Sequence, residues 1–575
     1  MLRRTGWLGL LAVFSLCLAL PGTAADPPAA GTDGLAGATG SPGLGRLWAP
    51  APPRPDPEGQ IARLQLRRNL VNVSKLALAV FGAGLLAWGI WLQRRGRPQA
   101  HAALRDALLV GLGFLGFWGW WNFLYLHYPG WLHEHEVFNY YIGSKYFPEL
   151  GYTRLYECTA LADFGGGLQA RVEARSITNL ESYVLEGTQA VLADPQRCLG
   201  HFAPARWNAF QADVAWFRTQ FEPDLWEALQ RDHGYNAPPS WGLLGNLLAN
   251  TAPASRGQLL LLSLLDPVLL LGMWACVGWA FGWRPLCIAL LYWGTNHAGE
   301  FGWTGGGFLR NDWLVATVVG ICLLRRGHSL LAGFLLGHSA LLRIFPALTL
   351  AAVGAAAGLR ALAARSPKPL LAERRFALGA LLAAALVLPL SSIVAGGATA
   401  WKNFAENTRL HLATPGSNTV GLRTALSYSQ AGRLKQLATN PDPSAAWKRA
   451  REAAFQDRRV LYALALLAYL ALLLRALAGQ DAWAAAILGI GALPVLLDPA
   501  CYYTKVLFVF AFLTPRREAI GVALLGLSAA QWLVAAGFSE WDDVFTWTSV
   551  ASVAFAVFAT AAASIPRASG QAASE

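Results

Sequence analysis

Long apolar runs separated by short polar stretches dominate the chain from residue 75 onwards. An apolar helix needs roughly 20 residues to cross the hydrocarbon core of a bilayer, so the pattern predicts about 11–13 membrane segments. Several runs are too short to cross alone, and we expect these to be broken or re-entrant and shielded by neighbouring protein. The candidate segments are 75–93, 106–127, 259–283, 286–303, 313–324, 329–342, 346–359, 377–396, 459–478, 482–498, 503–515, 519–538 and 545–565. The pattern predicts an all-α fold, a polytopic transmembrane helical bundle with a large helical external loop.

Composition agrees with lipid as the main solvent. The 575-residue chain is 55% hydrophobic and 14% charged, with a mean hydropathy of +0.37, which is more apolar surface than one soluble core can bury. The net charge of +12 would indicate nucleic acid in a soluble domain. Here the basic residues stand in pairs beside apolar runs, as cytoplasmic flanks do, so we expect membrane lipids and no nucleic acid as partners. These pairs are Arg94 and Arg95, Arg325 and Arg326, Arg374 and Arg375, and Arg516 and Arg517.

The charge pattern also predicts an orientation. Placing the basic pairs in the cytoplasm puts the loop 128–258 outside, and this loop holds nine Lys or Arg against fourteen Asp or Glu. The segment 397–458 falls on the same side although it is basic. We interpret it as a second external segment, with an anionic surface as its candidate neighbour.

The remaining domain boundaries follow from composition. Residues 1–25 have the basic start, apolar middle and small-residue end of a signal peptide, or else form an uncleaved anchor. Residues 26–58 are rich in Pro, Gly and Ala and predict a flexible linker. The other predicted parts are an extra N-terminal span with a cytoplasmic loop (59–105), a membrane core (106–396) and the C-terminal spans (459–575).

Two features of the external loop concern its own packing. Trp207, Phe210, Val214, Phe217 and Phe221 recur every three or four residues, which predicts an amphipathic helix. We favour ordinary core over a membrane-surface role for this aromatic stripe. Cys158 and Cys198 share the loop and form either a disulfide or two free thiols.

The motif His-Glu-His-Glu at 133–136 stands where the chain leaves the membrane. A carboxylate at such a boundary is partly desolvated, which raises its pKa and suits it to accept a proton from a hydroxyl. A solvated interfacial cluster is the alternative. Metal binding is a third possibility, not favoured, because His133 and His135 point apart on a helix and no HExxH motif follows.

The stretch EVFNYYIGSKYFPELGYTRLYE resembles the first external loop of GT-C glycosyltransferases, especially the polyprenyl-phosphate-mannose-dependent mannosyltransferases. In that family an acidic residue, usually Asp, precedes a Tyr-rich helix and then a Gly followed by Leu-Tyr. Glu136 stands at the acidic position, Tyr140 and Tyr141 at the aromatic pair, and Gly151 before Leu155-Tyr156. The resemblance implies a GT-C-like fold with Glu136 as the catalytic base.

Arg343 carries a second resemblance. An Ala- and Gly-rich helix ends at Arg343-Ile-Phe-Pro346, as helices of this superfamily commonly end at a basic residue and a Pro. The charge pattern independently places Arg343 at the external turn of a helical hairpin, where an arginine is costly unless it meets an anion or a polar cavity. Its candidate role is to hold a phosphate; capping a carbonyl or pairing with a carboxylate is the alternative.

Two further polar stretches fall on the same side. WGTNHAGEFGWTGGGFLRNDWL offers phosphate ligands and a reserve base, Glu300, while RLHLATPGSNTVGLRTALSY is similar to a late external segment of the same mannosyltransferases. A short loop with an N-capped helix explains the second stretch almost as well. The candidate substrate-binding residues are His133, Glu134, His135, Tyr140, Tyr141, Lys145, Asn296, His297, Arg310, Asp312, Arg343, His411, Asn418 and Arg423.

The resemblance implies an enzyme of the cytoplasmic (inner) membrane with its active site outside. It would transfer a sugar, such as mannose or another hexose, from a polyprenyl-phosphate donor to a hydroxyl of a glycan, lipid or protein acceptor, with inversion. The scheme requires no cofactor and no metal, since arginine charge stands in for a cation. The alternatives are a transporter or flippase for a lipid-linked or anionic solute, a polysaccharide polymerase or ligase, and a metal-dependent enzyme using the His/Glu motif.

Overall fold

The computed structural model describes residues 57–565 except residues 129, 415 and 441. The predicted signal peptide or anchor and the predicted linker up to residue 56 lie outside the described residues. The described chain is almost entirely helical, and eight helical stretches are long and apolar enough to cross a membrane. The prediction of an all-α, multi-pass membrane protein is confirmed. The long stretches are α2 (Pro57–Arg94), α3 (Ala102–Trp120), α13 with α14 (Arg256–Ser263 and Leu265–Phe281), α19 (Ala347–Ala364), α21 (Arg374–Val394), α25 (Pro443–Leu477), α28 (Glu518–Gly537) and α29 (Trp541–Ser564).

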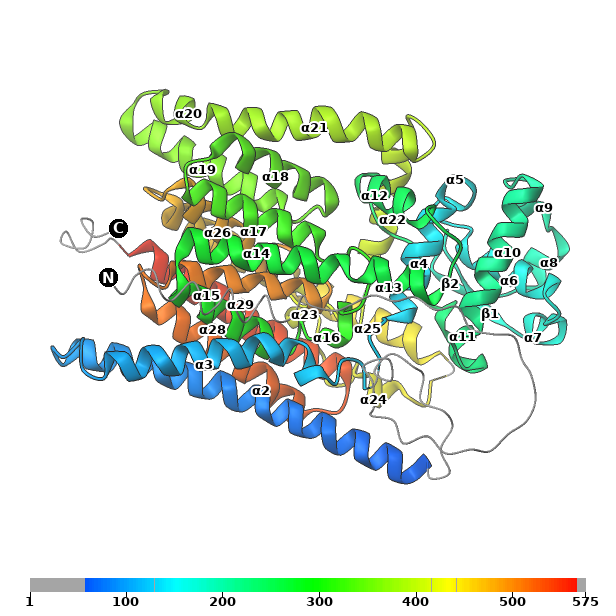
Figure 1. Cartoon of the computed structure of the whole chain (residues 1–575), viewed down its shortest axis with the longest axis horizontal. Helices are drawn as coiled ribbons and strands as arrows, with labels where there is room; N and C mark the ends of the chain where they lie inside the picture. The colour runs from blue at the N-terminus through cyan, green and yellow to red at the C-terminus, as the bar shows by residue number, and fades with distance from the viewer. Residues whose placement is uncertain (1–56, 129, 415, 441, 566–575) are drawn as a thin grey trace, which may run out of the picture. The chain divides into compact units, whose positions relative to one another are not determined.

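The other predicted segments are shorter helices. Neighbouring helices bury η3, a 3-10 helix, and α26 on nearly every side, as expected for segments that cannot face lipid alone. Figure 1 shows α26 beside α17 and α19 among the membrane helices. The short elements are α15 (Trp283–Thr295), α17 (Asp312–Arg325), α18 (Ser329–Leu342), α26 (Ala482–Gly491) and η3 (Cys501–Leu513).

Helix α2 is longer than predicted. It has 38 residues, which at 1.5 Å per residue is about 57 Å, well beyond the ~30 Å hydrocarbon core. It begins at Pro57, so the last two residues of the predicted linker are helical. Helix α2 packs along α3 and α28 (Figure 1).

Helix α3 ends at Trp120, seven residues earlier than the predicted span, which ran to residue 127. The next residues, including Asn122, take left-handed backbone angles. The Asn122 side chain accepts a hydrogen bond from Lys75 Nζ (2.5 Å) and donates one to the Leu126 carbonyl (2.8 Å). This pairing with α2 holds the chain in a tight turn, η2 (Asn122–Leu124), where the apolar pattern alone predicted continued helix.

Small residues set the closest helix contacts. At the crossing of α3 and α15, a Cβ atom on Gly294 would lie 1.6 Å from the Gly116 carbonyl oxygen. At the crossing of α18 and α21, a Cβ atom on Gly379 would lie 2.0 Å from the Leu330 carbonyl oxygen. Lipid tails are as apolar as the helix surfaces, so the hydrophobic effect does little to hold membrane helices together. Close approach at glycines instead provides van der Waals contact between the helix backbones.

Residues 131–258, most of the predicted external loop 128–258, form a layer that we call the cap. Figure 1 shows it gathered at one end of the membrane helices. The strands β1 and β2 make an antiparallel hairpin, in register from Ser176–Gly187 to Asn179–Val184. The cap elements are α4 (Glu134–Lys145), α5 (Phe147–Leu150), α6 (Leu155–Gly165), α7 (Gln169–Glu173), β1 (Ser176–Asn179), β2 (Val184–Gly187), α8 (Gln189–Ala193), α9 (Gln196–Leu199), α10 (Pro204–Arg218), α11 (Pro223–Leu229) and α12 (Pro239–Ala249).

The buried apolar residues of the cap continue into the core of the membrane helices. Phe210, Val214 and Phe217 on α10 are fully buried, so the aromatic stripe belongs to ordinary core. Cys158 and Cys198 form a disulfide, which settles the alternative left open by the sequence. Because the two cysteines join α6 to α9, the bond ties the hairpin-containing half of the cap together.

Several cations of the segment 397–458 have partners within the protein. Arg423 pairs with Glu452 (2.8 Å), Arg433 pairs with Asp543, and Arg451 donates to the Thr424 carbonyl (2.6 Å). Other cations of this part of the chain, Lys435, Arg449 and Arg459 among them, are exposed. Its elements, with the neighbouring short helices, are α16 (Phe301–Thr304), α20 (Lys368–Ala372), α22 (Ala400–Ala413), α23 (Leu422–Leu426), α24 (Leu434–Leu437) and α27 (Leu493–Leu496).

The glycine crossing of α3 and α15 provides a test of the packing. Gly294→Ala should destabilise the protein by about 1–3 kcal/mol, because the added methyl group overpacks the contact. The measurement is the thermal unfolding midpoint in detergent. Gly272→Ala is the matched control, since a Cβ atom there meets nothing within 4 Å and alanine favours helix by up to ~1 kcal/mol. Equal midpoints for the two variants would contradict this account of the crossing.

Candidate functional site

Glu136 lies in the first turn of α4. His133 caps this helix, and its Nδ1 accepts a hydrogen bond from the Glu136 backbone N–H (3.3 Å). The Glu136 side chain is 20% exposed, so the carboxylate lies at the edge of the protein core and remains accessible.

The backbone at Arg310 is fixed by hydrogen bonds to Asp266. It lies between α16 and α17, where the backbone N–H groups of Arg310 and Asn311 donate to the Asp266 carboxylate (2.9 and 3.3 Å). The Asn311 side chain donates to Asp266 (2.9 Å) and accepts from Lys505 Nζ (2.5 Å). Asp266, Asn311 and Lys505 therefore form a buried bracket that fixes the loop carrying Arg310.

The structure brings Glu136 and Arg310 together. Glu136 Oε2 lies 2.6 Å from Arg310 Nε, and the Arg310 side chain is 2% exposed. The N–H bond does not point along this contact, so it is an ion pair without a well-aligned hydrogen bond. The guanidinium carbon lies 4.2 Å from the centre of the Tyr140 ring and 5.7 Å from that of Tyr502. Arg310 is thus a desolvated cation between two aromatic faces, close to one carboxylate.

Arg343 joins this group from the end of α18. Its Nε donates to the Tyr503 hydroxyl (3.1 Å) and its Nη1 to the Leu342 carbonyl (2.7 Å). Carbonyl capping, the alternative considered from sequence, therefore does occur. However, Nη2 of Arg343 and Nη1 of Arg310 are buried and have no hydrogen-bond partner among the residues that the structure describes. The two guanidiniums are near enough to feel each other's charge, and Asp312 acts on both.

We call Glu136, Tyr140, Arg310, Arg343, Tyr502 and Tyr503 the arginine centre. Tyr502, Tyr503 and Lys505 were not predicted, although the sequence DPACYYTK interrupts an apolar run and carries a charge inside it. Asp266 gives the same signal, a carboxylate within an apolar run. Ionisable residues within membrane segments are functional candidates by default, so this rule would have found Asp266 and Lys505.

Glu300 and His297 belong to a different group. Glu300 Oε2 lies 4.0 Å from Lys75 Nζ of helix α2. The His297 ring lies edge-on to Trp532, with centroids 4.8 Å apart, and Asn296 Oδ1 accepts from the Gly299 N–H (2.5 Å). The reserve base is thus paired with a buried lysine from the extra N-terminal span.

Two histidines of the predicted site meet at Asp232. His135 Nε2 lies 2.8 Å from one Asp232 oxygen and His233 Nδ1 lies 3.1 Å from the other. The His411 ring of α22 lies 5.3 Å from His233. Burial acts to raise the pKa of Asp232, but the hydrogen bonds from His135 and His233 outweigh it and lower that pKa. This cluster joins α4, α22 and the loop before α12.

Five predicted residues lie apart from the arginine centre. The Tyr141 hydroxyl donates to the Ala252 carbonyl (2.8 Å), and Lys145 Nζ pairs with Asp213 (2.8 Å). Both hold α4 inside the cap. Glu134 is exposed. The Asn418 carbonyl accepts from the Cys501 N–H (2.7 Å), just before Tyr502, and Arg423 pairs with Glu452.

The histidines at 133 and 135 are separated by the fold. The His133 ring packs edge-on against His127, with centroids 5.1 Å apart, while His135 faces Asp232. Across residues 57–565, as far as the structure describes them, no three His, Cys, Asp or Glu side chains are grouped to hold a metal ion.

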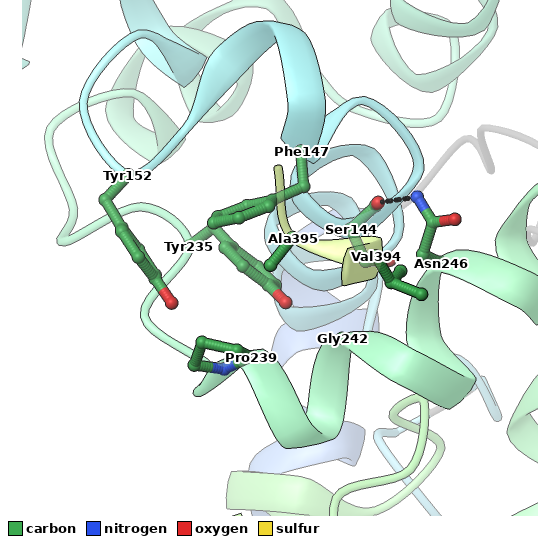
Figure 2. A pocket seen from close by; sticks show the side chains of 9 residues that line it. All are labelled: Ser144, Phe147, Tyr152, Tyr235, Pro239, Gly242, Asn246, Val394 and Ala395. Carbon is green, nitrogen blue, oxygen red and sulfur yellow. Dashed lines mark hydrogen bonds between the residues drawn. The ribbon is translucent and has the colours of Figure 1, made fainter. Parts of the chain in front are cut away.

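One small hollow lies beside the arginine centre, since the ring of Tyr235 in its wall lies 5.8 Å from that of Tyr140. Ser144, Phe147, Tyr152 and Tyr235 contribute to its wall, and Asn246 donates to the Ser144 carbonyl (2.8 Å) beside it (Figure 2). Its accessible space of about 10 Å³ is close to that of one water molecule. A space of this size does not admit a sugar ring.

Comparison with protein-family models, curated proteins and solved structures found no match.

Three buried histidines make a test by pH. Burial lowers the pKa of His127, His133 and His411 from 6.5 to about 4 in each case. The unfolded chain then binds these protons more readily, so the free energy of unfolding should fall as pH drops from about 6.5 towards 4. His135 opposes this, because its hydrogen bond to Asp232 raises its pKa against the effect of burial. Taking these four histidines together, we expect a lower unfolding midpoint at about pH 5 than at about pH 7.5.

The measurement is thermal unfolding in detergent at the two pH values. His411→Asn should reduce the difference between them, whereas His328→Asn, on an exposed residue, should leave it unchanged. A midpoint that does not change with pH, or that rises on acidification, would contradict the assignment.

Proposed function

We propose that this protein is a GT-C-like membrane glycosyltransferase that takes a sugar from a polyprenyl-phosphate donor and transfers it, with inversion, to an acceptor hydroxyl. One observation carries the proposal. Two buried arginines, Arg310 and Arg343, each retain an unpartnered N–H group among the described residues, and Arg310 lies beside the carboxylate of Glu136. Planar guanidinium groups match phosphate oxygens, and an unpaired N–H in a buried site is costly unless a ligand accepts from it.

The carboxylate supplies the second half of the chemistry. Glu136 accepts the proton of the acceptor hydroxyl as its oxygen attacks the anomeric carbon of the donor. The bond from that carbon to the phosphate oxygen breaks, and polyprenyl phosphate leaves with the bonding electrons. Arg310 and Arg343 stabilise the negative charge that develops on the leaving phosphate. The Tyr140, Tyr502 and Tyr503 rings exclude water and line the path of the sugar or its carrier.

The compartment follows from the same resemblance and from the cap. Disulfides persist in oxidising compartments, so the Cys158–Cys198 bond supports a cap that lies outside the cytoplasm. The basic pairs at the other helix ends support the same orientation of the cytoplasmic membrane. On this orientation the active site faces outside, where the donor is a lipid-linked sugar, and the acceptor is a glycan, lipid or protein.

Transfer of radiolabelled sugar from membrane lipid donors tests the proposal. Membranes carrying Glu136→Gln at matched expression should lose one labelled product, with a rate about 10²–10⁴-fold lower, because the base is gone. Arg343→Gln should lower kcat about 10²–10³-fold, the usual cost of one oxyanion donor. Arg409→Gln is the matched control, since it removes an exposed cation of the same side and should leave the rate unchanged.

Different outcomes identify different errors. Wild-type turnover in Glu136→Gln together with loss in Glu300→Gln would move the base to Glu300. If neither variant loses any labelled product, the glycosyltransferase is excluded, and uptake or translocation of a lipid-linked solute becomes the activity to measure.

A further inference from the structure

We propose that a cavity at the end of the bundle away from the cap binds an anionic phospholipid. The lipid phosphate lies at Arg516 and Arg517, and its acyl chains begin on the apolar floor of the cavity. The cavity has a volume of about 310 Å³, within the ~300–1,000 Å³ that ligand pockets occupy. This lipid site is distinct from the arginine centre and does not depend on the proposed glycosyltransferase activity.

The cavity lies about one bilayer thickness from the arginine centre. Helix α29 begins at Trp541, whose ring lies 5.6 Å from that of Trp303, and the Trp303 ring lies 6.2 Å from that of Tyr502. From there α29 runs for 24 residues, or about 36 Å. Its last residues, Ala563 and Ser564, line the cavity, and Figure 1 shows this red end of α29 opposite the cap. On the orientation proposed above, the cavity therefore faces the cytoplasmic leaflet.

Two arginines bring positive charge to the cavity wall. The charged lining residues are Arg516, Arg517 and Asp481, so two positive charges and one negative charge leave a net charge of +1. A phospholipid with a single negative charge, such as phosphatidylglycerol, complements this balance. Planar guanidinium groups also match the geometry of phosphate oxygens.

Both arginines are held in place by the protein. Arg516 Nη2 lies 2.5 Å from an Asp481 oxygen, and its guanidinium carbon lies 4.1 Å from the centre of the Trp483 ring. Its side chain is 8% exposed. Arg517 Nη2 donates to the Ile565 carbonyl (2.5 Å). Side chains fixed in this way lose little conformational freedom when a ligand binds, which favours affinity.

The rest of the lining favours a lipid over a free anion. Leu488, Leu513 and Ile520 contribute an apolar floor, and a free phosphate gains nothing from such a surface. Leu474 on α25 and Phe558 on α29 lie about one to two turns before the cavity and are 46% and 45% exposed. An apolar surface of this kind continues from the cavity towards the acyl chains. Basic pockets between membrane helices on the cytoplasmic side bind anionic lipid head groups in this manner.

Native mass spectrometry of the protein in detergent tests the site. The wild type should bind dioleoyl phosphatidylglycerol about 5-fold more tightly than dioleoyl phosphatidylcholine, which has the same chains and no net charge. Arg517→Gln should raise the Kd for phosphatidylglycerol about 5-fold, the contribution of one arginine near a membrane surface. Ala563→Trp, which places an indole ring in the cavity, should remove the tight binding.

Two variants at the same membrane end serve as controls. Arg475→Gln removes an exposed arginine from the last turn of α25, outside the cavity lining, and should bind phosphatidylglycerol as the wild type does. Ala471→Trp adds the same ring to an exposed position of α25 and should also leave the Kd unchanged. Thermal unfolding midpoints equal to that of the wild type establish that each variant is folded.

Three results would overturn the lipid site. One is equal affinity of the wild type for the two lipids, which decides the matter even where a variant fails to fold. Another is an equal loss in Arg475→Gln and Arg517→Gln, since diffuse charge at this membrane end then accounts for the binding. The third is inorganic phosphate that binds as tightly as the lipid, because the cavity is then a site for a free anion. None of these results bears on the glycosyltransferase proposal.

Discussion

Asp266 lies inside an apolar helix, where an unpaired carboxylate would cost several kcal/mol. Two backbone N–H groups, one side-chain amide and the nearby charge of Lys505 compensate it. That requirement determines the path of the chain between α16 and α17. With the loop fixed in this way, the Arg310 side chain extends between Tyr140 and Tyr502 to Glu136. The position of the arginine centre therefore depends on a carboxylate that is not one of its members.

The same rule of paired charge explains where the sequence was informative. Membrane segments were predicted well, because a run of roughly 20 apolar residues almost always forms a helix that spans the bilayer. Their ends were predicted less well. Helix α3 stops early because Asn122 pairs with Lys75, which is a contact between residues 47 positions apart. Hydropathy describes a residue's solvent and carries no information on such partners.

In the candidate site, too, some residues could be identified from the sequence and others only from the fold. The motif around Glu136 and the position of Arg343 at a helix end were both predictable, because each is a polar residue where a span must end. Arg310 shared its stretch with one other candidate phosphate ligand, His297, and only the tertiary fold separates the two, since His297 lies with Lys75 and Glu300. Tyr502 and Tyr503 were not predictable, since aromatic residues beside a membrane segment have an ordinary interfacial role.

Helix α2 lies at the edge of the bundle and precedes the region that resembles a glycosyltransferase, yet it supplies Lys75 to Glu300 and to Asn122. Helix α2 therefore supplies the positive charge that pairs with Glu300, in a loop that is remote from it in sequence. A chain shortened to begin after residue 95 would keep every other helix of the described chain but would leave Glu300 without its lysine and the 122–128 turn without its tether. Helix α2 is therefore more than a membrane anchor, because it is also part of the structure around Glu300 and the 122–128 turn.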